Sequence, residues 1–64
     1  MKINGEQKEY PAGLSISEML IREGFVKERV AVELNAEIVA KENYDATILK
    51  DEDVVEVVSF MGGG

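Results

Sequence analysis

The sequence has neither cysteine nor histidine. Without cysteine it forms no disulfide framework and no thiolate metal site, and without histidine it lacks the commonest general base and metal ligand. It also has no apolar run long enough to span a bilayer. These absences argue against a membrane protein and against an independent enzyme, which needs a constellation of catalytic side chains.

Basic residues are also scarce. Seven lysines and arginines stand against thirteen aspartates and glutamates, which gives a formal net charge of −6. This charge opposes binding to a nucleic-acid backbone or an anionic membrane, and it favours a partner protein with a basic surface. Because the chain opens with Met1, Lys2, Ile3, Asn4 and Gly5 rather than a signal peptide, we expect a cytoplasmic protein.

The length of 64 residues predicts one domain over residues 1–64. A chain of this size is near the lower limit at which a hydrophobic core stabilises a fold without help. Since no disulfide contributes, its stability must come from packing and regular secondary structure.

The clearest local signal predicts a helix that begins at Ile16. Ser15 and Glu18 form a capping box, in which each side chain accepts a hydrogen bond from the other residue's backbone N–H. Gly24 suits the left-handed position after the last helical residue, and Phe25 then folds back onto the helix. Leu14, before the cap, pairs with Met19 as a hydrophobic staple. The predicted apolar stripe comprises Ile16, Met19, Leu20 and, at its margin, Ile21.

Two hairpins are predicted on either side of this helix. The dipeptide Asn4-Gly5 suits a tight turn after Ile3, and residues 6–10 return as a polar strand at a sheet edge. Residues 30–34 alternate as a half-buried strand does, residues 35–37 make a turn, and residues 38–40 return as a short strand.

The segment after the second hairpin is predicted to be irregular. Residues 41–44 make a single helical turn, with Tyr44 covering an open end of the core while its hydroxyl stays in water. Residues 50–53 are all charged and predict a solvated turn. Their carboxylates lack the spacing and the glycine of a calcium loop, so we expect no metal site.

Residues 54–60 form the most β-prone segment of the chain. Its apolar residues occupy both faces, with Val55 and Val57 on one side and Val54, Val58 and Phe60 on the other. A strand that is apolar on both sides usually lies inside a sheet. The last strand is therefore predicted to be central.

The order of these elements predicts an α+β fold of the β-grasp (ubiquitin-like) type. One main helix packs on one face of a mixed sheet of four to five strands, the first and last strands pair in parallel, and a flexible glycine tail covers residues 61–64. The predicted core comprises Ile3, Leu14, Met19, Leu20, Phe25, Val32, Leu34, Ile48, Val55 and Val57.

The chain ends in Phe60, Met61, Gly62, Gly63 and Gly64. Glycine has no Cβ, so a Gly-Gly end can thread a narrow channel and present its carboxylate to a nucleotide in a partner enzyme. The competing interpretation is an uninformative frayed end. For Phe60, core packing competes with a partner contact.

Four segments together resemble the ThiS family, the ubiquitin-like sulfur carriers of thiamine biosynthesis related to MoaD. They are residues 1–6, the capped helix ending at Gly24, residues 30–35 and residues 53–64. The most specific piece is the ending Val58-Ser59-Phe60-Met61-Gly62-Gly63-Gly64. The resemblance covers essentially the whole chain.

The resemblance implies a function in which this chain is a co-substrate and not an enzyme. A ThiF-like enzyme would adenylate the Gly64 carboxylate with ATP, and sulfur from a cysteine desulfurase would then give a thiocarboxylate for the thiazole synthase ThiG. Gly62 and Gly63 would thread the partner's active site, and Phe60 and Met61 would dock on it. The chain would bind no cofactor or metal and supply no catalytic residue.

Three alternatives stay open at this point. A carrier of another pathway, above all the MoaD type that serves molybdopterin, would share the fold, the tail and the activation. A protein modifier would form an isopeptide through Gly64. A non-covalent β-grasp binding module would use its sheet face or a strand edge and would not need the tail.

Overall fold

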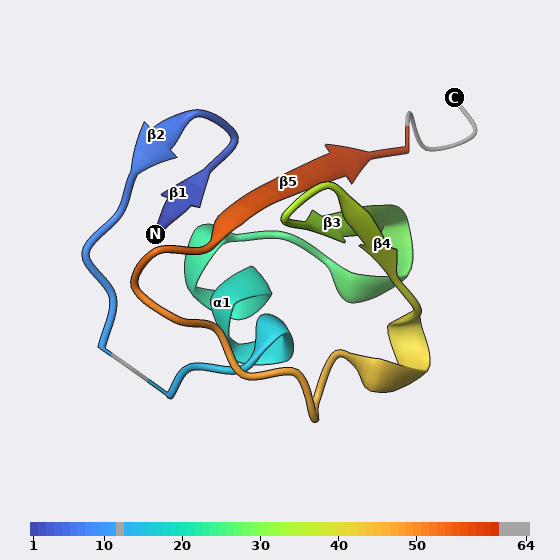
Figure 1. Cartoon of the computed structure of the whole chain (residues 1–64). Helices are drawn as coiled ribbons and strands as arrows, with labels where there is room; N and C mark the ends of the chain where they lie inside the picture. The colour runs from blue at the N-terminus through green and yellow to red at the C-terminus, as the bar shows by residue number, and fades with distance from the viewer. Residues whose placement is uncertain (12, 61–64) are drawn as a thin grey trace.

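A computed structural model describes residues 1–11 and 13–60 of the chain. Figure 1 shows α1 lying against one face of a five-stranded sheet whose strand order is β2-β1-β5-β3-β4. The predicted β-grasp architecture is confirmed. The elements are β1 (Lys2–Ile3), β2 (Glu6–Gln7), α1 (Ile16–Glu23), the 3₁₀ helix η1 (Lys27–Arg29), β3 (Val30–Leu34), β4 (Glu37–Val39), the 3₁₀ helix η2 (Lys41–Asn43) and β5 (Val54–Ser59).

The strand β5 is central, as its sequence predicts. It pairs in parallel with β1 and antiparallel with β3, while β2 and β4 form the two edges. In Figure 1 it crosses the molecule from the side of the β1–β2 hairpin to the side where the described chain ends. The fold thus holds the first part of β5 on both sides, and β3 holds the strand up to its final residue, Ser59.

Two asparagines extend the hydrogen bonding of β5. Asn4 and Asn35 have positive φ angles of 52° and 51°, which asparagine tolerates better than most residues. The Asn4 Oδ1 accepts from the Val57 N–H at 2.7 Å, and the Asn35 Oδ1 accepts from the Val54 N–H at 2.9 Å. Both hairpin turns are therefore fastened to the central strand by side chains.

The ends of α1 match the sequence prediction. The Ser15 hydroxyl accepts from the Glu18 N–H at 3.1 Å, and a Glu18 carboxylate oxygen accepts from the Ser15 N–H at 2.9 Å. At the other end Gly24 has a φ of 82°, and the Phe25 N–H donates to the Leu20 carbonyl at 2.8 Å. This closes the helix as a Schellman motif.

The helix contributes a narrower apolar face than predicted. Ile16, Met19 and Leu20 are buried, whereas Ile21 is 75% exposed and belongs to the solvent side. The inward face meets one face of the sheet, and the buried core is Met1, Ile3, Leu14, Ile16, Met19, Leu20, Val30, Val32, Tyr44, Leu49, Val55 and Val57.

Three residues that the sequence places in the core are not fully buried. Ile48 is 50% exposed, and Leu49 is buried in its place. The Leu49 N–H donates to the Leu14 carbonyl at 2.8 Å, which fixes the register of this segment against the chain before α1. Phe25 and Leu34 are partly buried and pack against the core from its margin.

The environment of Tyr44 differs from the prediction. Its side chain is among the largest that are fully buried, with 1% exposure, so the expectation of a hydroxyl in water is wrong. Burial raises the pKa of Tyr44, and a hydrogen bond with the Val32 backbone offsets part of that rise. Tyr44 is therefore a core residue and not a cover over the core.

The predicted solvated turn at residues 50–53 is wrong at its last position. Asp53 is buried, and one carboxylate oxygen accepts from the Lys50 N–H at 2.8 Å while the other accepts from the Asn35 Nδ2 at 3.1 Å. Its negative charge is therefore held by donors from two segments. Among the described residues no group of acidic side chains is placed to hold a metal ion, and no helix is long and apolar enough to cross a membrane.

The edge strands are shorter or shifted relative to the prediction. The strand β2 ends at Gln7 rather than at residue 10, and β4 begins at Glu37 rather than at residue 38. The second shift arises because the β3–β4 turn needs only two residues, Asn35 and Ala36, both with positive φ. This is the backbone of a type I′ hairpin turn.

Ala36 is strained in this turn, because its φ of 72° is in the left-handed region that disfavours a Cβ. We expect Ala36→Gly to raise the free energy of unfolding by about 0.5–1 kcal/mol. Ala40, with a φ of −67°, is the matched control, and Ala40→Gly is expected to lower the free energy by a similar amount. Urea unfolding of both variants measures the effect, and a loss of stability in Ala36→Gly contradicts it.

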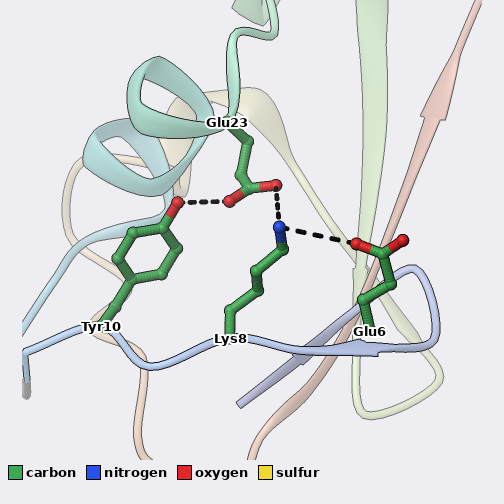
Figure 2. Close-up of polar contacts among 4 residues, drawn as sticks. All are labelled: Glu6, Lys8, Tyr10 and Glu23. Atoms are coloured by element: carbon green, nitrogen blue, oxygen red, sulfur yellow. Dashed lines mark hydrogen bonds and ion pairs between the residues drawn. The ribbon is translucent and has the colours of Figure 1, made fainter.

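A polar network ties the segment after β2 to the end of α1. Figure 2 shows the Tyr10 hydroxyl donating to one oxygen of Glu23, while the Lys8 Nζ is 3.8 Å from the other oxygen and 3.5 Å from Glu6. The Lys8–Glu6 contact is exposed and contributes little. The hydrogen bond to Glu23 is the main cause that raises the pKa of Tyr10.

Both tyrosines are expected to ionise at higher pH in the folded chain than in the unfolded one, where the pKa is about 10. Because the folded-state pKa of each tyrosine is raised, its contribution to the free energy of unfolding is complete below the unfolded-state pKa of about 10. This contribution is lost as the pH rises through the folded-state pKa. Near-ultraviolet absorbance follows both groups, since the chain has two tyrosines and no tryptophan. The Tyr10→Phe variant leaves Tyr44 as the one tyrosine that titrates. If tyrosine absorbance changes at the same pH in the folded chain and in the chain unfolded by urea, the prediction is contradicted.

Candidate functional site

The candidate site is the end of β5, where the described chain stops. Ser59 pairs with Val30 on β3, and the Phe60 N–H donates to the Arg29 carbonyl of η1 at 2.8 Å. The backbone is therefore hydrogen-bonded to the neighbouring segment through Phe60. The other predicted site residues, Met61, Gly62, Gly63 and Gly64, lie outside the described residues.

The Phe60 side chain lies on the surface and is 54% exposed. Of the two interpretations of this residue, ordinary core packing is therefore excluded. The Lys41 ammonium lies 5.5 Å from the centroid of the Phe60 ring, within the range of a cation–π contact. The same ammonium donates to the Val30 carbonyl at 2.7 Å.

The outer face of the sheet, opposite α1, is partly apolar. Strand register places Val54, Val58 and Ile38 on this face, and each is 44% exposed or more. Glu33 and Glu56 lie directly opposite each other on the same face. Like charges in this position repel, so a basic group on a partner would relieve the pair.

The prediction that β5 is central is correct, but its outer face is not covered. Val54 and Val58 were assigned to the strand by their β propensity, and the structure leaves them in contact with solvent. Neither Lys41 nor Ile38 has a local sequence signal that places it on this surface. The register of β4 places Ile38 on the outer face, and the turn into η2 brings Lys41 beside the Phe60 ring at the end of β5.

The described residues at the end of β5 combine aromatic, basic and apolar groups on one surface. Around Phe60 they offer an exposed ring, a lysine held by a carbonyl, and an apolar face with paired carboxylates. These groups suit recognition by a complementary protein surface. The reactive group that the sequence predicts, the Gly64 carboxylate, lies beyond them along the chain.

Comparison with known proteins identifies the family. The model of the ThiS family matches residues 1–64, which is the whole chain. The chain belongs to the ThiS family. The sulfur carrier protein ThiS of Bacillus subtilis (strain 168) is 35% identical over 65 aligned residues, which cover 100% of this chain and 98% of that protein.

Solved structures and a longer relative agree with this ThiS-family assignment. The crystal structure of the thiamine biosynthesis protein ThiS from Geobacter metallireducens matches with a TM-score of 0.83 and 39% identity, covering 98% of this chain and 96% of that one. A thiazole synthase of Magnetococcus marinus is 42% identical over 62 residues, 97% of this chain. The chain spans 19% of that enzyme's length.

Proposed function

We propose that this ThiS-family chain is a sulfur carrier of thiamine biosynthesis and that it carries the sulfur as a thiocarboxylate on Gly64. The observation that carries the proposal is the family match, which covers residues 1–64. The Bacillus relative, similar over its whole length, is itself a sulfur carrier protein. The structure supports the proposal with a rigid central strand that leads directly into the tail.

The chemistry requires the Gly64 carboxylate to become an acyl donor. A carboxylate oxygen attacks the α-phosphate of ATP, pyrophosphate leaves, and an acyl adenylate forms. The terminal sulfur of a cysteine persulfide then attacks the acyl carbon and displaces AMP. A second thiol then attacks the cysteine sulfur of the resulting acyl disulfide, forms a new disulfide with that cysteine and releases the thiocarboxylate. Each step takes place in a partner, so this chain is a co-substrate that is consumed and regenerated.

Three classes of partner follow from these steps. A ThiF-like enzyme supplies adenylation, a cysteine desulfurase supplies sulfur, and a thiazole synthase of the ThiG type accepts it. The Magnetococcus thiazole synthase supports the last, because a fifth of that enzyme resembles this chain. We propose a cytoplasmic location, where ATP and these enzymes are available. The net charge of −6 favours basic docking surfaces on the partners.

Phe60 is proposed to dock on the activating enzyme, together with Met61. We expect Phe60→Ala to raise the KM of this chain as a substrate about tenfold, because an exposed aromatic beside the reacting tail is a typical interface anchor. Ile21→Ala is the matched control, since Ile21 is an even more accessible apolar residue, on α1. Steady-state adenylation kinetics measure both. An unchanged KM for Phe60→Ala contradicts the docking role.

Adenylation itself is tested by pyrophosphate release. The chain, a ThiF-like enzyme and ATP are mixed without a sulfur source, so that the reaction stops at the adenylate. We expect pyrophosphate in proportion to the amount of chain added, and none without it. Release that is independent of the chain would remove the chemical basis of the proposal.

A further inference from the structure

We propose that Lys41 is a positioning residue, which holds the Phe60 ring in its docking orientation before the activating enzyme binds. This inference rests on the proposed function and deepens it. Lys41 lies on η2, far from the tail in sequence. It reaches the end of β5 because β4 and β3 bring η2 back alongside that end.

The lysine is itself fixed at both ends. Its backbone belongs to η2, and its ammonium donates to the Val30 carbonyl at 2.7 Å. An exposed lysine normally samples many rotamers, but this one is only half exposed and has a defined acceptor. The charge is therefore held at one place on the surface.

The Phe60 ring lies against that fixed charge. Its centroid is 5.5 Å from the Lys41 Nζ, while its backbone N–H donates to the Arg29 carbonyl at 2.8 Å. The residue is thus held at its backbone by η1 and at its ring by η2. The last described side chain before the tail is restrained although it is 54% exposed.

Restraint before binding is useful because an ordered side chain loses less entropy when it docks. The contact acts on encounter with the enzyme and not on the adenylation step, since the reacting carboxylate is four residues further along the chain. Removal of the lysine charge is therefore expected to raise KM and to leave kcat unchanged. From the strength of a cation–π contact at an exposed site, the rise is about three- to fivefold.

The chain supplies a matched control for this test. Lys27 also lies over an aromatic ring, with its Nζ 6.0 Å from the centroid of Tyr44, and it is also half exposed. Lys27→Met removes the same charge from a contact that does not involve Phe60. Lys41→Met is the test variant, and Lys41→Arg restores a cation that can donate to the Val30 carbonyl and stack on the ring.

The experiment measures KM and kcat for adenylation of the full chain by a ThiF-like enzyme, after circular dichroism has shown each variant to be folded. The inference expects a raised KM for Lys41→Met, recovery in Lys41→Arg, and no change in Lys27→Met. In the Phe60→Ala background, Lys41→Met is expected to have no further effect, because its target ring is absent.

Each other outcome has a definite meaning. An unchanged KM for Lys41→Met, an equal rise in Lys27→Met, or a full additional effect in the Phe60→Ala background overturns the positioning role alone. If the wild-type chain is not adenylated, the proposed function fails and takes this inference with it. The wild-type reaction therefore separates the two failures.

Discussion

Deletion of Gly63 and Gly64 is expected to abolish adenylation and sulfur loading while leaving the fold intact. The proposed reacting carboxylate would be lost, and the new carboxylate on Gly62 would be two residues too short to reach the nucleotide. Terminal residues without side chains usually contribute little to stability, so the free energy of unfolding should change by less than about 0.5 kcal/mol. Pyrophosphate release measures the loss of adenylation, and urea unfolding measures the free energy of unfolding.

The truncated chain also distinguishes the carrier from a non-covalent binding module. Because it keeps Phe60 and the outer sheet face, it should bind the activating enzyme and inhibit adenylation of the full chain competitively. A binding module would instead keep its full activity after truncation. Sulfur transfer by the shortened chain would therefore refute the role of Gly64.

Tyr44→Ala is expected to remove most of the stability of the domain. Truncation of a fully buried aromatic side chain costs about 3–5 kcal/mol. The whole domain, at about 0.05–0.15 kcal/mol per residue, has a free energy of unfolding of the same order. We expect a large unfolded fraction at physiological temperature, measured by thermal unfolding with circular dichroism.

Tyr44→Phe is the control that separates the ring from the hydroxyl. It keeps the buried ring and removes only the group that hydrogen-bonds with the Val32 backbone, so the expected cost is about 1 kcal/mol. If Tyr44→Ala is no more destabilising than Tyr44→Phe, the ring is not part of the core.

Local chemistry made much of the fold predictable. The capping box of Ser15 and Glu18 and the left-handed Gly24 define both ends of α1 through contacts within a few residues. The Asn4-Gly5 turn defines the first hairpin in the same way. The parallel pairing of β1 and β5 follows from the order of the elements, because the first hairpin with the helix and the second hairpin then flank these two strands on opposite sides.

The errors fall where distant segments decide the outcome. Ile48 and Leu49 are adjacent apolar residues, and the pairing of this segment with the chain before α1 fixes the register in which Leu49 faces the core. The sequence predicts that the Tyr44 hydroxyl stays in water and that Asp53 lies in a solvated turn, yet both residues are buried, with contacts to β3 and its turn. A linear pattern does not contain such contacts.

The residues of the candidate site also differ in whether a continuous stretch of sequence can reveal them. The tail and Phe60 were identified from the sequence, because glycine composition and family resemblance are properties of a continuous segment. Lys41 was not, because its role depends on a contact between η2 and the end of β5. A charged residue in a polar segment gives no sequence signal of such a contact.

The most direct test of the central claim is the mass of the chain after incubation with a ThiF-like enzyme, ATP, a cysteine desulfurase and cysteine. The account predicts an increase equal to the difference between one sulfur and one oxygen atom, located by fragmentation at Gly64 and absent when ATP is omitted. An unchanged mass with enzymes shown to be active, or sulfur located at any other residue, would contradict it.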